Sequence, residues 1–405
     1  MKRPLRIGLV MQGGAGWIGG SEYIRNLILV CSHLPAAERA DFELCLISGH
    51  PLDSGFTRNG LDHLYELSTA LPPATLPNRV CWLVERRLLD RPNSRFAKFV
   101  AAERFDFLYP LTYDNRQTVQ VSLPIRDALG TCRWAGWIPD FQHRFMPELF
   151  SAKEIANRDA GIGALADDAK TIVFSSESAA ADFAKFYPRS AAKIEVLRFH
   201  TYPDSSWFEG DPLAVRRQFH LPERFFIVSN QFWQHKNHAV LFQALALLRA
   251  RGIEPAVVCT GHPNDFRSKD YFNTLLRLLH ELGVAPQVHL LGLIARKEQI
   301  QLMRAALAVV QPSLFEGWST VVEDARALGK PVIYSDLPVH LEQNPHGSVS
   351  FQRDSPESLA ARLAEWWETS ATGPDAAAET TARARAAEAA LGYARRFLEI
   401  VRTAA

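Results

Sequence analysis

The chain has 405 residues, of which 47% are apolar and 22% charged, and its net charge is +1. This length exceeds one ordinary hydrophobic core and suits two domains, and the balanced charge excludes a nucleic-acid footprint spread over the whole surface. The five cysteines form no C-x-x-C pair, so neither a disulfide framework nor a zinc site is indicated, and a cytoplasmic location is expected. Glycines break the first apolar run too early for a signal peptide or a membrane span.

Short apolar runs alternate with segments of helical periodicity, a pattern typical of α/β folds with parallel sheets. In the first half, strands are expected at 5–11, 42–48, 107–111, 134–138, 171–175 and 194–197. In the second half, strands are expected at 225–229, 256–260, 288–291, 308–311 and 331–335, with helices at 238–249 and 376–402.

The periodicity stops at residues 200–212, where prolines, a glycine and other turn residues gather. Such a composition indicates an interdomain linker. We therefore predict a first domain over 1–205 and a second over 215–380. A terminal helix at about 385–405 is expected to dock on either domain, with packing back on the first as one option.

A glycine-rich turn follows the first strand, and Gly14, Gly16 and Gly19 match G-x-G-x-x-G. In dinucleotide-binding folds this motif places a pyrophosphate on a helix N-terminus. Such folds also need an acidic residue at the end of the second strand, whereas Asp41 precedes that strand. The motif is incomplete, so we expect a turn that faces a phosphate or a sugar. A tight structural turn and an NAD-dependent dehydrogenase remain the alternatives.

The most informative segment is 311–338, where a buried strand runs into a loop, a helix and a second strand. In such folds ligands bind beyond the carboxyl ends of the strands, near helix N-termini. The free N–H groups of a first helical turn suit a diphosphate. The residues that occupy this place are Glu316, Gly317, Trp318, Ser319 and Thr320.

Two glutamates followed by a G-K-P-V-I strand make this segment similar to the family 4 (group 1) glycosyltransferases. Here the glutamates are Glu316 and Glu323, with six residues between them where the family usually has seven. The resemblance implies the GT-B fold, in which two Rossmann-like domains face each other across a cleft. It assigns Glu316 to the donor sugar and Glu323 to the ribose hydroxyls. A capping box from Thr320 to Glu323 is the alternative role of the second glutamate.

A second motif runs from the strand end near Ser229 to Asn237, which is expected to cap the next helix. Lys236 stands just before that helix, where the macrodipole disfavours a cation unless an anion is bound. The resemblance implies that Lys236 contacts the leaving diphosphate. It also places Gln231 where the family has an arginine, which removes one positive charge from the phosphate site.

Other positions receive roles by the same resemblance. Asp140 and His143, after a strand of the first half, are the two candidates for a polar group near the anomeric carbon, and the sequence does not decide between them. Lys236 and Glu316 are the other catalytic candidates. The remaining expected donor-binding residues are Gly19, Gly20, Gly261 and Leu293.

The implied activity is retaining transfer of a sugar, of hexosyltransferase type, from a UDP- or GDP-linked nucleotide sugar to an acceptor hydroxyl in bacterial polysaccharide or glycolipid assembly. No D-x-D triplet occurs, so neither a metal nor another cofactor is expected. Segment 78–104 carries seven Lys/Arg among apolar side chains. It is either a peripheral contact with the inner membrane face, which fits a lipid-linked or glycan acceptor, or a solvated surface. The alternatives to the implied glycosyltransferase activity are a GT-B epimerase and a non-catalytic nucleotide-sugar-binding protein.

Overall fold

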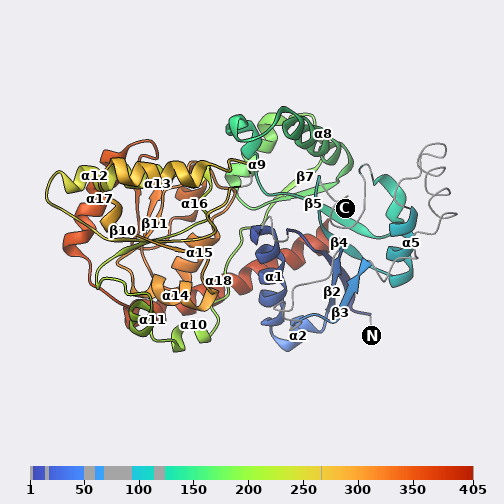
Figure 1. Cartoon of the computed structure of the whole chain (residues 1–405). Helices are drawn as coiled ribbons and strands as arrows, with labels where there is room; N and C mark the ends of the chain where they lie inside the picture. Colours follow the sequence, from blue (N-terminus) through green and yellow to red (C-terminus); the bar gives the residue numbers. More distant parts are fainter. Residues whose placement is uncertain are drawn as a thin grey trace. The chain divides into compact units, whose positions relative to one another are not determined.

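The computed structural model describes residues 3–13, 18–49, 60–67, 94–113, 123, 125–265 and 267–404. The chain divides into two compact units, here called unit 1 (Met1–Phe199 with Ala390–Ala405) and unit 2 (His200–Ala389). Each unit holds one parallel sheet with helices around it (Figure 1). The predicted α/β class with two Rossmann-like domains is therefore confirmed.

Unit 1 contains a seven-stranded sheet in the order β3-β2-β1-β4-β5-β6-β7, so the strand order reverses between β1 and β4. Its strands are β1 (Leu5–Val10), β2 (Phe42–Ser48), β3 (His63–Glu66), β4 (Phe107–Leu111), β5 (Arg133–Ile138), β6 (Thr171–Phe174) and β7 (Lys193–Val196). Its helices are α1 (Ile18–Ser32), α2 (Ala36–Arg39), α5 (Ser94–Glu103), α7 (Gln142–Phe145), α8 (Ala152–Asp168) and α9 (Glu177–Phe186).

Unit 2 contains a six-stranded sheet in the order β10-β9-β8-β11-β12-β13. The chain moves outward from β8 to β10 and then returns to the other side of β8. The strands are β8 (Phe226–Ser229), β9 (Val257–Thr260), β10 (Val288–Gly292), β11 (Val309–Gln311), β12 (Val332–Ser335) and β13 (Val349–Phe351). The helices are α10 (Ser206–Glu209), α11 (Pro212–Gln218), α12 (His238–Arg249), α13 (Tyr271–Glu281), α14 (Arg296–Ala305), α15 (Thr320–Ala327), α16 (Pro338–Gln343) and α17 (Pro356–Thr369).

Both faces of the unit 2 sheet are covered, which is why its strands read as continuous apolar runs rather than alternating ones. Helices α12, α13 and α17 pack on one face around Leu241, Leu275 and Leu363 (Figure 1). Helices α11, α14 and α15 cover the other face, with Ile300 and Val322 in the core. The sheet is thus fixed on both sides, and its carboxyl edge is left to carry loops.

The terminal helix α18 (Ala376–Thr403) begins in unit 2 and ends in unit 1. In unit 2, Glu379 makes a buried bidentate ion pair with Arg304 at 2.7 and 3.0 Å. In unit 1, the ring of Phe397 packs against Tyr109, with 5.5 Å between centroids. The helix expected at 376–402 is present, and its two ends belong to different cores.

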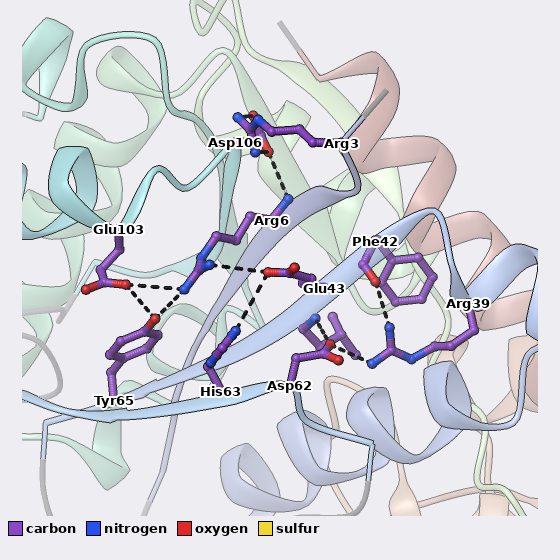
Figure 2. Close-up of polar contacts among 11 residues, drawn as sticks. Arg3, Arg6, Arg39, Phe42, Glu43, Asp62, His63, Tyr65, Glu103 and Asp106 are labelled. Atoms are coloured by element: carbon purple, nitrogen blue, oxygen red, sulfur yellow. Dashed lines mark hydrogen bonds and ion pairs between the residues drawn. The ribbon is translucent and has the colours of Figure 1, made fainter. Parts of the chain in front are cut away.

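A network of ion pairs and hydrogen bonds joins Arg6 and Glu43, near the amino ends of β1 and β2, to Tyr65 on β3 and Glu103 (Figure 2). Arg6 on β1 contacts Glu43 on the neighbouring strand at 3.3 Å and Glu103 at the end of α5 at 3.2 Å. Tyr65 on β3 donates to the same Glu103 carboxylate at 2.6 Å. Ligands of doubly wound sheets bind at the opposite edge, so we interpret this network as structural.

Three sequence expectations need correction or limits. The edge strands β3 and β13 were not predicted, and a short helix, α10, lies within the linker at 200–212 that was expected to lack periodicity. Most of segment 78–104 lies outside the described residues, which resume at residue 94. Among the described helices, none combines the length and the apolar character needed to span a membrane.

Candidate active site at the carboxyl edge of unit 2

The strand order of unit 2 reverses between β8 and β11, and doubly wound sheets bind ligands at such a point. Two loops leave the sheet there, 230–237 after β8 and 312–319 after β11. The first loop carries Lys236 and the second carries Glu316. The structure therefore brings together two residues that lie 80 positions apart in the sequence.

Lys236 and Glu316 form an ion pair in which Nζ lies 2.6 Å from Oε1, and their side chains are only 16% and 9% exposed. The same oxygen accepts hydrogen bonds from Gln311 Nε2 at 2.9 Å and from Ser313 Oγ at 2.7 Å. Burial alone would raise the pKa of Glu316, but Lys236, His340 and the Ser313 hydroxyl outweigh it and leave this pKa below its ordinary value. Glu316 is therefore an anion held in a fixed orientation.

Helix α15 begins directly after the loop that carries Glu316, so its N-terminus lies at this loop. Its N-cap is Ser319, whose Oγ accepts from the amide of Val322 at 3.4 Å. The amides of Thr320 and Val321 are the first two in the helix, so neither has an acceptor inside it. Such amides and the positive end of the helix dipole suit a bound anion.

The capping-box alternative for Glu323 is wrong, because the cap is Ser319 rather than Thr320. The carboxylate of Glu323 instead accepts from Gln343 Nε2 at 3.0 Å and lies 3.0 Å from Nδ1 of His200. It is 1% exposed. Both of its oxygens thus have protein partners.

Asp324 is a buried carboxylate that the sequence reasoning missed. Seven residues separate it from Glu316, which is the usual family spacing, whereas Glu323 stands one residue short. Arg296 NH2 lies 2.6 Å from its Oδ1, and Thr201 donates to the same oxygen at 3.3 Å. No hydrogen bond reaches Oδ2 from the described residues. The sequence did hold a signal for Asp324. Counting the residues from Glu316 to both Glu323 and Asp324 would have shown that Asp324 has the usual spacing.

The other predicted donor residues lie on neighbouring loops. Gln231 and Gly261 approach closely, since a Cβ on Gly261 would stand 2.8 Å from the amide nitrogen of Gln231. Gly317 and Trp318 are half-buried between Glu316 and the cap of α15. Leu293, by contrast, is 66% exposed and follows the edge strand β10. Asn237 stands at the start of α12, but its side chain makes no cap hydrogen bond.

Gly261 is expected to tolerate no side chain. Its φ is +137°, and an added Cβ would lie 2.2 Å from the carbonyl oxygen of Asn230. Gly261→Ala should therefore lower the free energy of unfolding by about 2 kcal/mol or more. Urea denaturation measures this change. Gly252→Ala is the control, because Gly252 has φ +75° but open space around it. An equal loss of unfolding free energy in both variants would mean that the close approach of Asn230 to Gly261 contributes nothing to the effect.

The predicted residues of unit 1 fall in different environments. Gly19 and Gly20 belong to helix α1, so they are helical and not part of the expected turn. Gly14 and Gly16 lie outside the described residues. Asp140 is half-buried, and its Oδ1 accepts from the amide of Gln142 at 2.9 Å, as in a turn that ends a strand.

His143, the other candidate for a polar group near the anomeric carbon, is a buried side chain. Its ring is buried and its Nε2 lies 2.9 Å from Asp159 of α8. Arg144 contacts the same carboxylate oxygen at 2.8 Å. Burial lowers the pKa of His143 below its ordinary value. The imidazole is thus a packed, neutral side chain inside unit 1, and Asp140 is the candidate that keeps exposed surface.

Three buried histidines surround the loops of the site, and sequence reasoning missed them. His235, His238 and His340 are each 5% exposed or less. Burial is the main cause that lowers all three pKa values, to about 3 for His238 and about 4 for His340. Near neutral pH these rings therefore carry no charge that would compete with Lys236.

His238 is expected to make unfolding pH-dependent. Its pKa is about 3 in the folded chain and about 6.5 when unfolded. The unfolded chain therefore takes up a proton that the folded chain refuses. The stabilisation is complete above pH 6.5 and falls by about 1.4 kcal/mol per pH unit as the pH decreases below it. His238→Phe retains a ring that can stack on Phe232, as the imidazole does with 4.4 Å between ring centroids. In urea unfolding between about pH 6.5 and 5, the variant should show an unfolding free energy that depends less steeply on pH, by the equivalent of one proton. An unchanged slope would contradict the buried neutral ring.

Comparisons with known proteins match the part of the chain that holds this candidate site. Residues 214–386 match the family described as glycosyl transferases group 1. D-inositol 3-phosphate glycosyltransferase of Mycolicibacterium gilvum is 28% identical over 214 residues, which cover 51% of this chain and 47% of that protein. A putative glycosyltransferase of Bacillus subtilis, EpsF, is 32% identical over 109 residues, or 26% of each chain. This chain thus spans about half the length of the first curated relatives that it matches.

Solved structures extend the likeness to nearly the whole chain. HepE of Anabaena, in complex with UDP and glucose, has a TM-score of 0.68 at 19% identity, covering 98% of this chain and 100% of that one. Sucrose-phosphate synthase of Thermosynechococcus elongatus has a TM-score of 0.66 at 16% identity, with 98% of each chain covered. At such identities the likeness establishes the fold, which is GT-B with two Rossmann-like domains, as the resemblance implied.

Proposed function

Because residues 214–386 match the group 1 glycosyl transferases, we propose that this chain is a glycosyltransferase that takes a sugar from a nucleotide diphosphate. The observation that carries the proposal is the Lys236–Glu316 ion pair at the reversal point of the unit 2 sheet. The proposed reaction retains the configuration at the anomeric carbon and transfers a hexose to an acceptor hydroxyl. Its proposed setting is bacterial polysaccharide or glycolipid assembly on the cytoplasmic side of the membrane.

The leaving diphosphate is proposed to lie between Lys236 and the N-terminus of α15. As the glycosidic bond breaks, negative charge grows on the diphosphate, and donors already aimed at it lower the barrier. Lys236 supplies an ammonium group and the amides of Thr320 and Val321 supply two N–H donors. Gln231 adds no charge where the resemblance expects one, so Lys236 is the main cation in this proposal. No metal is assigned a role.

The donor sugar is proposed to contact Glu316. Lys236, Gln311 and Ser313 all donate to its Oε1. No hydrogen bond from the described residues reaches Oε2. An anionic oxygen with open lone pairs accepts well from a sugar hydroxyl.

The ribose is proposed to be held by a carboxylate of the Glu323–Asp324 pair. The resemblance gave this role to Glu323, but both oxygens of Glu323 are already engaged. Asp324 stands at the seven-residue spacing and its Oδ2 accepts no hydrogen bond from the described residues. We therefore assign the ribose hydroxyls to Asp324, with Glu323 as the rival that a direct test must exclude. Gly261 and Leu293 remain proposed contacts of the nucleotide.

The acceptor is proposed to approach through unit 1, with Asp140 as the polar group near the reacting carbon. A glycan or a lipid-linked acceptor and a peripheral membrane contact through 78–104 remain part of this proposal. The burial of His143 against Asp159 favours Asp140 of the two candidates.

Product analysis with UDP- and GDP-linked hexoses and a panel of acceptors tests the proposal. Acceptor-dependent release of the nucleoside diphosphate, with the anomeric configuration retained by NMR, is the expected result. An altered sugar nucleotide formed without any acceptor would instead identify the epimerase alternative. Tight nucleotide binding without turnover on any acceptor would identify a binding protein, and reduction or oxidation of NAD(P)(H) would identify a dehydrogenase.

A further inference from the structure

A buried histidine of α16 lies behind the loop that carries Glu316. His340 is fully buried, and its Nδ1 lies 3.1 Å from both the carbonyl oxygen and the Oγ of Ser335. A carbonyl oxygen only accepts hydrogen bonds, so Nδ1 carries the ring proton. The other nitrogen, Nε2, has no hydrogen-bond partner among the described residues. The ring therefore uses one side only, as a donor toward Ser335.

The hydrogen bonds continue from Ser335 to Glu316. Ser335 ends strand β12, and its Oγ donates to the carbonyl oxygen of Ser313 at 2.6 Å. The hydroxyl of Ser313 in turn donates to Oε1 of Glu316 at 2.7 Å. This series of bonds, here called the His340 relay, fixes the loop after β11 from the neighbouring strand. It sets where the Ser313 hydroxyl stands, and thereby one of the three donors that orient the Glu316 carboxylate.

The burial of the ring makes a purely space-filling role unfavourable. An imidazole whose Nε2 is left without a donor in the interior costs free energy that an apolar side chain of similar size would not. His340 and Glu316 are also close enough for each charge to shift the pKa of the other group. The feature of His340 that the fold uses is the Nδ1–H bond at the head of the relay.

We propose that His340 is a positioning residue that holds Glu316, through Ser335 and Ser313, with its Oε2 turned toward the donor sugar. The inference rests on the proposed function, because it gives the orientation of Glu316 a purpose. His340 itself touches no substrate, since its side chain is fully buried.

The test uses the full chain with UDP-glucose as the probe donor and UDP as the probe ligand. His340→Leu removes the donor and should lower kcat for UDP release about 10- to 100-fold, since small misplacements at a reacting centre cost rates of this order. The affinity for UDP, which lacks the sugar, should change less than about twofold. His340→Asn, whose side-chain amide reaches the position of Nδ1, should recover most of kcat. His340→Gln places its amide toward Nε2 and should not.

Two controls separate the relay from a general loosening of α16. Tyr334→Phe removes the hydroxyl that donates to Asn344, at the end of the same helix, at 3.1 Å and should leave kcat unchanged. Ser335→Ala should match His340→Leu, and the double variant should lose no more than either single one. Equal losses in Tyr334→Phe and His340→Leu, or full activity in His340→Leu, would overturn the proposal.

Nitrogen-15 NMR of the wild-type imidazole provides a readout that does not depend on turnover. The relay requires the proton of His340 on Nδ1, and a proton on Nε2 overturns it even if the variants fail to fold. Calorimetry distinguishes a failure of the proposed nucleotide-sugar donor from a failure of the His340 relay. A wild-type chain that binds neither UDP nor UDP-glucose refutes the proposed donor while the NMR result still judges the relay.

Discussion

Lys236→Ala is expected to lower kcat/KM for the nucleotide-sugar donor about 100- to 1000-fold, the loss typical of one donor removed from a developing anion. The physical reason is that Lys236 supplies the main positive charge proposed at the leaving diphosphate. The affinity for UDP should fall as well, because UDP carries the same diphosphate. Steady-state kinetics of UDP release and calorimetry with UDP measure the two effects. Lys153→Ala, which removes an exposed lysine of unit 1, should change neither.

The same substitution also breaks a largely buried ion pair. Glu316 would keep its charge without a cation, which costs about 3–5 kcal/mol when one partner of such a pair is removed, so lost activity must be distinguished from lost folding. The double variant Lys236→Met with Glu316→Gln removes both charges and should recover most of the thermal stability. It should still bind UDP poorly. Wild-type UDP affinity in a folded double variant would contradict the role of Lys236.

Asp324→Asn is expected to remove most of the preference for ribose over deoxyribose in the bound nucleotide. A carboxylate that accepts from a ribose hydroxyl loses about 1–3 kcal/mol when its partner is missing, so wild-type protein should bind UDP about 10- to 100-fold more tightly than its 2′- or 3′-deoxy analogue. In Asp324→Asn, this ratio should fall toward one. Calorimetry with UDP and both deoxy analogues gives the ratio directly.

Glu323→Gln is the matched control, because it changes the adjacent carboxylate in the same helix. Its side chain bonds to Gln343 and His200, so the variant should lose stability while it keeps the ribose preference. The opposite pattern, with the preference lost only in Glu323→Gln, would return the ribose role to the residue that the resemblance first indicated.

Much of the fold was predictable because buried parallel strands leave a strong local signal. The strands at 42–48 and 107–111 and the helix at 238–249 were predicted with the bounds that the structure has. The edge strands β3 and β13 were missed, since a strand of three or four residues has too few apolar positions to stand out from a loop. Short edge elements depend on their neighbour in the sheet rather than on their own composition.

The site was predictable down to its loops but not to the direction of its side chains. The sequence placed Lys236 and Glu316 at strand ends, and parallel topology brings those ends to one edge. It did not reveal that His143 turns inward to Asp159, because that contact joins separate helices. Nor did it show which of Glu323 and Asp324 has a carboxylate oxygen left for a ligand. Neighbouring residues on a helix point about 100° apart, so the answer depends on how the helix is rotated against its neighbours. Such choices depend on contacts distant in sequence, as the His340 relay also does.

A crystal structure of the chain with UDP would test the central claim most directly. It should place diphosphate oxygens within hydrogen-bonding distance of Lys236 Nζ and of the Thr320 amide at the start of α15, with the ribose beside Asp324. A diphosphate bound away from the carboxyl edge of the unit 2 sheet, with Lys236 paired to Glu316 alone, would contradict the account.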